Sequence, residues 1–101
     1  MRKNNRLRLL VVFALLALFA GTLVAESAAE TYRIGKGAFD DGFYDLARRT
    51  LKRLVSEAPD SEFADRAQYH IGLSFFNQNN FTAAIFEMQT LLRSYPDSNL
   101  R

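Results

Sequence analysis

The feature that most restricts the fold of this chain is an internal repeat with a period of 37 residues. Residues 30–61 align with residues 67–98 without a gap. The identical pairs are Tyr32 with Tyr69, Ile34 with Ile71, Gly35 with Gly72, Phe39 with Phe76, Ala47 with Ala84, Leu54 with Leu91, and Pro59-Asp60-Ser61 with Pro96-Asp97-Ser98. These matches fall at apolar and helix-ending positions, which predicts one supersecondary unit that is copied and stacked.

Each copy of the repeat contains two segments with helical periodicity. Apolar residues recur at steps of three and four over 44–58 and over 81–95, which predicts amphipathic helices of about four turns. Helical spacing also runs through 30–39 and 62–76, just before them. The predicted fold class is therefore all-α, with antiparallel helix hairpins stacked as a short solenoid behind an apolar signal helix.

Glycine, asparagine and proline mark the ends of these helices. Gly42 and Asn79 occupy the same place in the two copies, and both residue types tolerate the left-handed backbone that a helix C-terminus often needs. Turns are therefore expected near 40–43 and 77–80. Pro59 and Pro96 should end the second helix of each copy. The expected N-caps of the helices that follow are Asp60, Ser61, Asp97 and Ser98.

Gly35 and Gly72 lie inside predicted helices, where glycine costs up to about 1 kcal/mol relative to alanine. Close approach of the partner helix would offset that cost. Ala47 and Ala84 are the small residues available on the facing helices. We therefore expect each hairpin to be packed tightly where glycine meets alanine.

The first 29 residues have the order of parts of a secretory signal peptide. A cationic head, in which Arg2, Lys3, Arg6 and Arg8 lie, precedes an uncharged run over 9–25. The small residues of Ser27-Ala28-Ala29 then allow cleavage after Ala29. The alternative is an uncleaved inner-membrane anchor through 9–25, since this run is only slightly shorter than the usual span of about 20 residues. Both predictions send the remainder across a membrane.

The predicted organisation is a leader over 1–29, one repeat over 30–61 and a second over 62–98. Residues 99–101 look like the start of a third repeat. Alternatives for a chain with two repeats are a structural piece that self-associates and a fragment of a longer repeat protein, because solenoids generally need about three repeats.

Charge and cysteine content exclude several classes of function. Residues 1–29 hold four of the 13 basic residues and one of the 11 acidic ones, so the remainder carries a net charge of −1. A near-neutral chain has no electrostatic footprint for nucleic acid. There is no cysteine, which excludes disulfides, Cys-ligated metals and the lipid-bearing cysteine of a bacterial lipoprotein within these residues.

No catalytic, metal or cofactor site is expected. The acidic stretch DDGFYD starting at Asp40 lacks the twelve-residue pattern of a calcium loop and coincides with the predicted turn. His70 is the only histidine and has no second ligand at helical spacing. We therefore predict that the chain is not an enzyme and that it needs no cofactor.

The repeat resembles the tetratricopeptide repeat (TPR), a 34-residue helix hairpin. Gly35 and Gly72 match the small residue at unit position 8, and Pro59 and Pro96 match the proline at position 32. The usual tryptophan at position 4 is missing, and three extra residues, Glu62-Phe63-Ala64, lengthen the second unit. With these departures the chain is similar to envelope repeat proteins of Gram-negative bacteria, such as BamD-like outer-membrane assembly lipoproteins and the TolA-binding cell-division coordinator.

This resemblance implies a protein or peptide partner in the periplasm or cell envelope, held in a groove lined by the first helix of each unit. The positions implied for the groove are Tyr32, Lys36, Phe39, Arg66, Tyr69, Leu73, Phe76 and Asn77. The function expected from the resemblance is that of an exported scaffold in an envelope assembly or division complex. Self-association as a homodimer stays open as an alternative.

Overall fold

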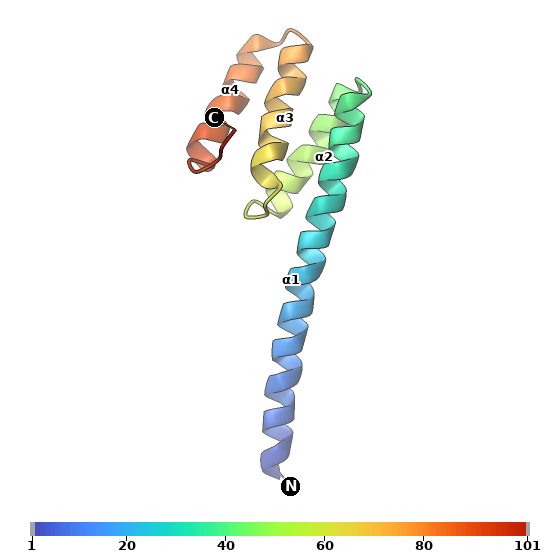
Figure 1. The fold of residues 1–101 in the computed structure, drawn as a ribbon, viewed down its shortest axis with the longest axis vertical. Helices are drawn as coiled ribbons and strands as arrows, with labels where there is room; N and C mark the ends of the chain where they lie inside the picture. The colour runs from blue at the N-terminus through green and yellow to red at the C-terminus, as the bar shows by residue number, and fades with distance from the viewer. Residues whose placement is uncertain (1, 101) are drawn as a thin grey trace.

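The computed structural model describes the backbone of residues 2–100, and the side chains of residues 5–18 and 27–100. Within this range the chain is all-α and has no strand, which confirms the all-α part of the predicted fold class. The helices are α1 (Arg2–Asp40), α2 (Tyr44–Glu57), α3 (Ala64–Asn77) and α4 (Phe81–Ser94). They form two hairpins, α1–α2 and α3–α4, that lie side by side (Figure 1).

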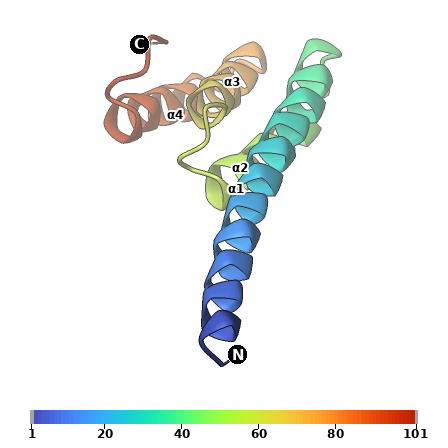
Figure 2. The same cartoon turned by 60° about the horizontal axis from the view of Figure 1, so that its bottom comes forward.

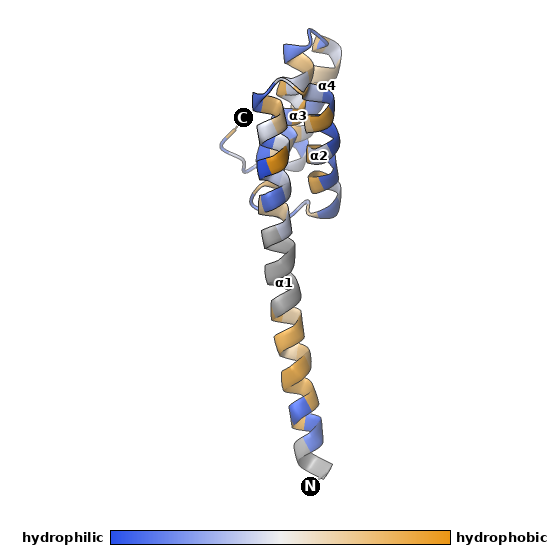
Figure 3. Ribbon diagram, turned by 90° about the vertical axis from the view of Figure 1, so that its right-hand side faces the viewer, coloured by the Kyte–Doolittle hydropathy of each residue, from blue (hydrophilic) through white to orange (hydrophobic). Residues whose placement is uncertain are grey.

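Helix α1 runs without a break from Arg2 into the first repeat. Its N-terminal part projects beyond the hairpins, and the apolar side chains between Leu7 and Leu18 are exposed (Figure 3). In the part of the chain that the structure describes, no helix has the length and apolar character needed to cross a membrane. The predicted apolar run over 9–25 extends into residues 19–26, whose side chains lie outside the described residues.

The two hairpin turns are built alike, as the sequence predicts. Gly42 has a φ of 82° and Asn79 a φ of 63°, so both adopt the left-handed conformation. The amide of Phe43 donates to the carbonyl of Ala38 at 2.9 Å, and in the second hairpin the amide of Asn80 donates to the carbonyl of Phe75 at the same distance. This closure satisfies the last carbonyls of α1 and α3 and reverses the chain.

The predicted break after α2 is confirmed, but the predicted caps of α3 are wrong. Residues 58–63 form turns, and α3 begins only at Ala64, with no side-chain cap. The amide of Ala64 donates to the carbonyl of Ser61 at 3.2 Å, so a turn takes the place of the expected cap, and the buried Ser61 hydroxyl has no partner. The side chain that does cap a helix is Asn80, which accepts from the amide of Ala83 at 3.2 Å at the start of α4.

The core lies between the hairpins, mainly where α2 meets α3. Figure 2 shows these two helices between α1 and α4. The buried cluster consists of Leu51, Leu54, Ala64, Ala67 and Ile71. Partly buried side chains packed against the cluster are Tyr32, Val55, Phe63, Phe75 and Tyr95. Because residues of both units make one core, the two hairpins stabilise each other.

The glycines on α1 and α3 allow close approach, although the partner differs from the prediction. A Cβ atom at Gly35 would lie 2.5 Å from Cδ2 of Leu51, and one at Gly72 would lie 2.8 Å from Cε of Met88. Both distances are too short for ordinary contact, so each glycine makes room for the large side chain at the same repeat position. Ala47 and Ala84 are buried one turn earlier on the facing helices.

Candidate protein-binding surfaces

The predicted groove residues lie on α1 and α3 and contact different neighbours. Tyr32 and Phe39 on α1 meet α3 around His70. Leu73 and Phe76 on α3 line a hollow that α4 completes. Asn77 donates to the hydroxyl of Tyr44 at 3.2 Å. A single groove that holds a partner across all eight residues stays a prediction.

The first surface is an aromatic cluster that surrounds His70. The centroid of the His70 ring lies 5.1 Å from Phe39, 5.5 Å from Tyr69 and 6.0 Å from Tyr32, each ring meeting it edge to face. Tyr32 also stacks on Phe63 at 5.5 Å. We call Tyr32, Phe39, Tyr69 and His70 the His70 cluster. The half-buried rings join α1 to α3 and leave part of their surface accessible.

Burial sets the protonation behaviour of His70. Desolvation lowers the pKa of its imidazole below the usual 6.5, and Lys36 acts in the same direction. Its Nδ1 lies 2.8 Å from the carbonyl oxygen of Arg66, so Nδ1 carries the hydrogen and donates it. Lys36 pairs with Asp40 at 2.7 Å beside the cluster. A search for metal ligands gives no sign of this role of His70, whereas Tyr32 and Phe39, two helical turns apart on α1, were the informative signal.

The second surface is an apolar hollow on the outer side of the second hairpin. We call it the α3–α4 hollow; its cavity volume is about 420 Å³. The residues that line it are Leu73, Phe76, Phe81, Ala84, Ile85, Met88, Gln89 and Leu92. Phe76 is 54% exposed and Ile85 is 59% exposed. Large exposed apolar side chains gathered in this way make the hollow a candidate surface for binding another polypeptide.

Polar contacts join the two hairpins on the other side of α3. The guanidinium of Arg48 donates to Oε1 of Gln78 at 2.7 Å and to Oγ of Ser74 at 3.2 Å. It also pairs with Asp45 and lies 4.2 Å from the ring centroid of Phe75. Only 13% of the Arg48 side chain is exposed, whereas its partners Asp45 and Gln78 are open to solvent.

A buried pair within the second hairpin occupies the place of the missing tryptophan in the second unit. Gln68 stands where the TPR pattern has that residue, and its Nε2 donates to Oε2 and to the carbonyl of Glu87 at 2.7 and 2.9 Å. Both side chains are buried, and Lys52 lies 3.7 Å from the carboxylate of Glu87. The pair joins α3 to α4 by hydrogen bonds at a position where an aromatic ring would join them by packing.

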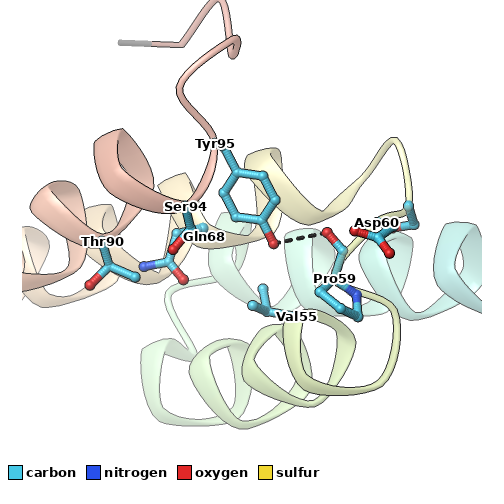
Figure 4. A pocket seen from close by; sticks show the side chains of 8 residues that line it. Val55, Pro59, Asp60, Gln68, Thr90, Ser94 and Tyr95 are labelled. Carbon is cyan, nitrogen blue, oxygen red and sulfur yellow. Dashed lines mark hydrogen bonds between the residues drawn. The ribbon is translucent and has the colours of Figure 1, made fainter.

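A polar pocket of about 410 Å³ separates the 58–63 loop from the end of α4 (Figure 4). It is lined by Val55, Pro59, Asp60, Ser61, Gln68, Thr90, Ser94 and Tyr95. The hydroxyl of Tyr95 donates to the carbonyl of Pro59 at 3.1 Å and so ties the end of one repeat to the end of the other. Among the described residues no group of acidic and histidine side chains is placed to hold a metal ion.

Helix hairpins repeated at a fixed spacing, closed by the same turn and stacked through a shared core define a helical repeat protein of the TPR type. The chain belongs to the YfiO family, described as outer membrane lipoprotein, whose family model matches residues 24–100. Comparison with curated proteins gave no significant match, and neither did comparison with solved structures. The 101 residues contain no cysteine, so the residue that would carry a lipid is not among them.

Proposed function

We propose that the chain is a protein-binding repeat scaffold that is exported and works in the bacterial cell envelope. The family description supports the envelope location, and the cationic and apolar order of residues 1–29 supports export. The role that fits this fold is to hold a partner protein of an envelope assembly or division complex, without catalysis.

The observation that carries the proposal is the α3–α4 hollow. Its lining is almost wholly apolar, with Gln89 as its single polar side chain. Burying such a surface releases roughly 25 cal/mol for each Å² of apolar area removed from water. A protein partner that covers Phe76, Phe81 and Ile85 would gain this free energy together with shape complementarity.

The His70 cluster supplies a second contact surface in this proposal. Tyr32, Lys36, Arg66 and Tyr69 combine accessible aromatic rings with positive charge on α1 and α3. Aromatic and arginine side chains are the residue types that contribute most to binding at protein interfaces. A partner that reaches along both helices would use these side chains after docking in the hollow.

Photocrosslinking in living cells tests the proposal on the full chain. A photoreactive phenylalanine analogue at Phe81 should crosslink a discrete envelope protein. The same analogue at Phe43, an exposed phenylalanine in the first turn that lies outside the hollow, should not do so. Equal yields at the two positions, or no adduct at Phe81, would contradict the proposed function.

Self-association is the second candidate function, and the same hollow favours it. Two copies could place their hollows face to face about a two-fold axis, the commonest geometry of homo-oligomers. Adducts at Phe81 with twice the mass of the chain would support this candidate over a different partner protein. An adduct of any other mass would exclude it as the main role of the hollow.

A further inference from the structure

We infer that the α3–α4 hollow binds an amphipathic helix of a partner protein, seated there as α3 is seated on the first hairpin. The inference rests on the proposed scaffold function and adds the geometry and the chemistry of the partner. The partner helix must present an uninterrupted apolar face, without the polar side chains that α3 uses at its own seat.

The position of the helix follows from the repeat. Subtracting the period of 37 residues from each residue that lines the hollow gives Lys36, Phe39, Tyr44, Ala47, Arg48, Leu51, Lys52 and Val55. These residues form the face of the first hairpin against which α3 packs. Leu51 and Val55 belong to the core shared with α3, and Arg48 and Tyr44 bond to α3 directly. The hollow is thus the vacant copy of an interface already present in the molecule.

The exposure of equivalent residues agrees with this reading. Leu51 is fully buried, whereas Met88 at the same repeat position is half-buried. Arg48 keeps only 13% of its side chain exposed under α3, while its equivalent Ile85 is 59% exposed. The two faces have the same architecture, and they differ in whether a helix covers them.

The chemistry of the partner follows from the three positions at which the first face carries a positive charge and the hollow does not. Lys36, Arg48 and Lys52 of the first face are replaced in the hollow by Leu73, Ile85 and Gln89. Arg48 donates to Ser74 of α3 and to Gln78, the residue that follows α3, so those two polar side chains have a cationic partner at the first seat. At the hollow the equivalent of that partner is Ile85, so Ser74 would keep only its bond to the carbonyl of Ile71 and Gln78 would lose the bond from the guanidinium, which is unfavourable.

The face of α3 also shows the spacing that the partner needs. Ala64, Ala67 and Ile71 enter the shared core, and Ser74 and Gln78 continue the same stripe. Small residues in the first turns let the backbone approach closely, and larger residues follow. A helix suited to the hollow keeps this order and carries apolar residues at the places of Ser74 and Gln78.

Two peptides and one exchange of residues test this inference on the full chain in mild detergent. The first peptide copies residues 62–79, and the second carries Ser74→Leu and Gln78→Leu in the same sequence. Fluorescence anisotropy of labelled peptides measures both affinities. The wild-type chain should bind the apolar peptide about tenfold or more tightly than the copy of α3, because two leucines bury apolar surface against Ile85 where the Ser74 hydroxyl and the Gln78 amide would lack the guanidinium.

The variant Ile85→Arg restores the arginine of the first face and should reverse this order of affinities. Phe86→Arg is the matched control, since Phe86 is an exposed neighbour outside the hollow, and it should leave the order unchanged. Ile85 is mostly exposed, so the substitution leaves the core intact, and circular dichroism checks that it does.

Three results would overturn the inference: equal affinities for the two peptides, an order that Ile85→Arg leaves as it was, or an equal effect of Phe86→Arg. The chain could instead prove to be a dimer that Ile85→Arg dissociates, with equal affinities for the two peptides. That result would assign the hollow to a second copy of the chain. The proposed function fails separately, because it depends on the crosslink at Phe81. If a partner is captured at Phe81 but Ile85→Arg does not reverse the order of the peptide affinities, the scaffold function stands and the inference of a bound helix is wrong.

Discussion

The two hairpins have the same backbone plan but different surroundings. Helix α3 is packed between α2 and α4, with a small contact to α1, while α4 has its outer side open. Ile71 of α3 is 1% exposed, whereas the equivalent Ile34 of α1 is 46% exposed. The same residue type at the same repeat position therefore has a different role, because neighbours on both sides cover α3 and not α1.

This difference shows that burial in a helical repeat is set by stacking and not by the unit alone. Residues of the first hairpin that face α3 combine apolar and cationic groups, and Arg48 and Lys52 have partners on α3. Most of their equivalents in the second hairpin are apolar, and the largest of these side chains are exposed. Substitutions at equivalent positions should therefore differ in cost, and the size of each difference measures how far the two hairpins have diverged.

The largest difference should appear at Leu51 and Met88. Leu51→Ala removes a fully buried side chain from the shared core and should lower the free energy of unfolding by about 3 kcal/mol. Met88→Ala, at the half-buried equivalent, should cost about 1 kcal/mol. Thermal unfolding of the full chain in detergent, followed by circular dichroism, measures both. Similar costs would mean that α3 does not shield the first hairpin as the structure shows.

Glycine-to-alanine substitution should also affect the two hairpins differently, with a smaller difference in the free energy of unfolding. A methyl group at Gly35 would meet Cδ2 and Cγ of the buried Leu51 within 2.7 Å, so Gly35→Ala should destabilise by about 2 kcal/mol. At Gly72 the nearest atom is the terminal methyl of Met88, which can move, and the helix preference for alanine of up to about 1 kcal/mol offsets the strain. A drop in melting temperature of equal size for both variants would contradict this distinction.

Much of this fold could be predicted from the sequence because the repeat shows each turn and each helix end at two equivalent positions. The left-handed residues Gly42 and Asn79, the hairpin turns and the breaks after α2 and α4 were all marked by residues of restricted backbone preference. The start of α3 could not be predicted in the same way, because Asp60 and Ser61 are equally suited to the turn that precedes the helix.

The neighbours of the predicted groove residues could not be read from the sequence. Leu73 and Phe76 lie on the same helix as Tyr69, but the hollow that they line also depends on α4, whose rotation about its axis no single residue reveals. The contacts of His70 with Tyr32, Phe39 and Tyr69 likewise depend on how α1 packs against α3.

A third comparison concerns Arg48 and Ile85. Arg48→Met keeps most of the apolar stem and removes the bonds to Ser74 and Gln78, so it should cost about 1.5 kcal/mol. Ile85→Met, at the exposed equivalent, should change stability by less than about 0.5 kcal/mol. Urea unfolding of both variants checks the difference. An Arg48→Met chain as stable as wild type would show that the polar contacts add nothing to hairpin stacking.

The smallest effect should come from pH, and it should be confined to the α1–α3 contact. Burial lowers the pKa of His70 in the folded chain below 6.5, so below that pH the unfolded chain binds more protons than the folded chain. The charged groups that face the imidazole, Lys36 and Asp40, oppose each other, which leaves burial as the main cause.

Stability should therefore fall as the pH is lowered from about 7.5 to about 5.5, the range in which an unperturbed imidazole titrates. His70→Phe keeps a ring among Tyr32, Phe39 and Tyr69 but cannot take up a proton, so its melting temperature should depend less on pH over this range. The difference between the two chains removes the contribution of the carboxylates, which titrate in both. Parallel pH profiles would mean that His70 is as accessible to solvent as Arg33, its equivalent on α1, which is exposed and paired with Glu30.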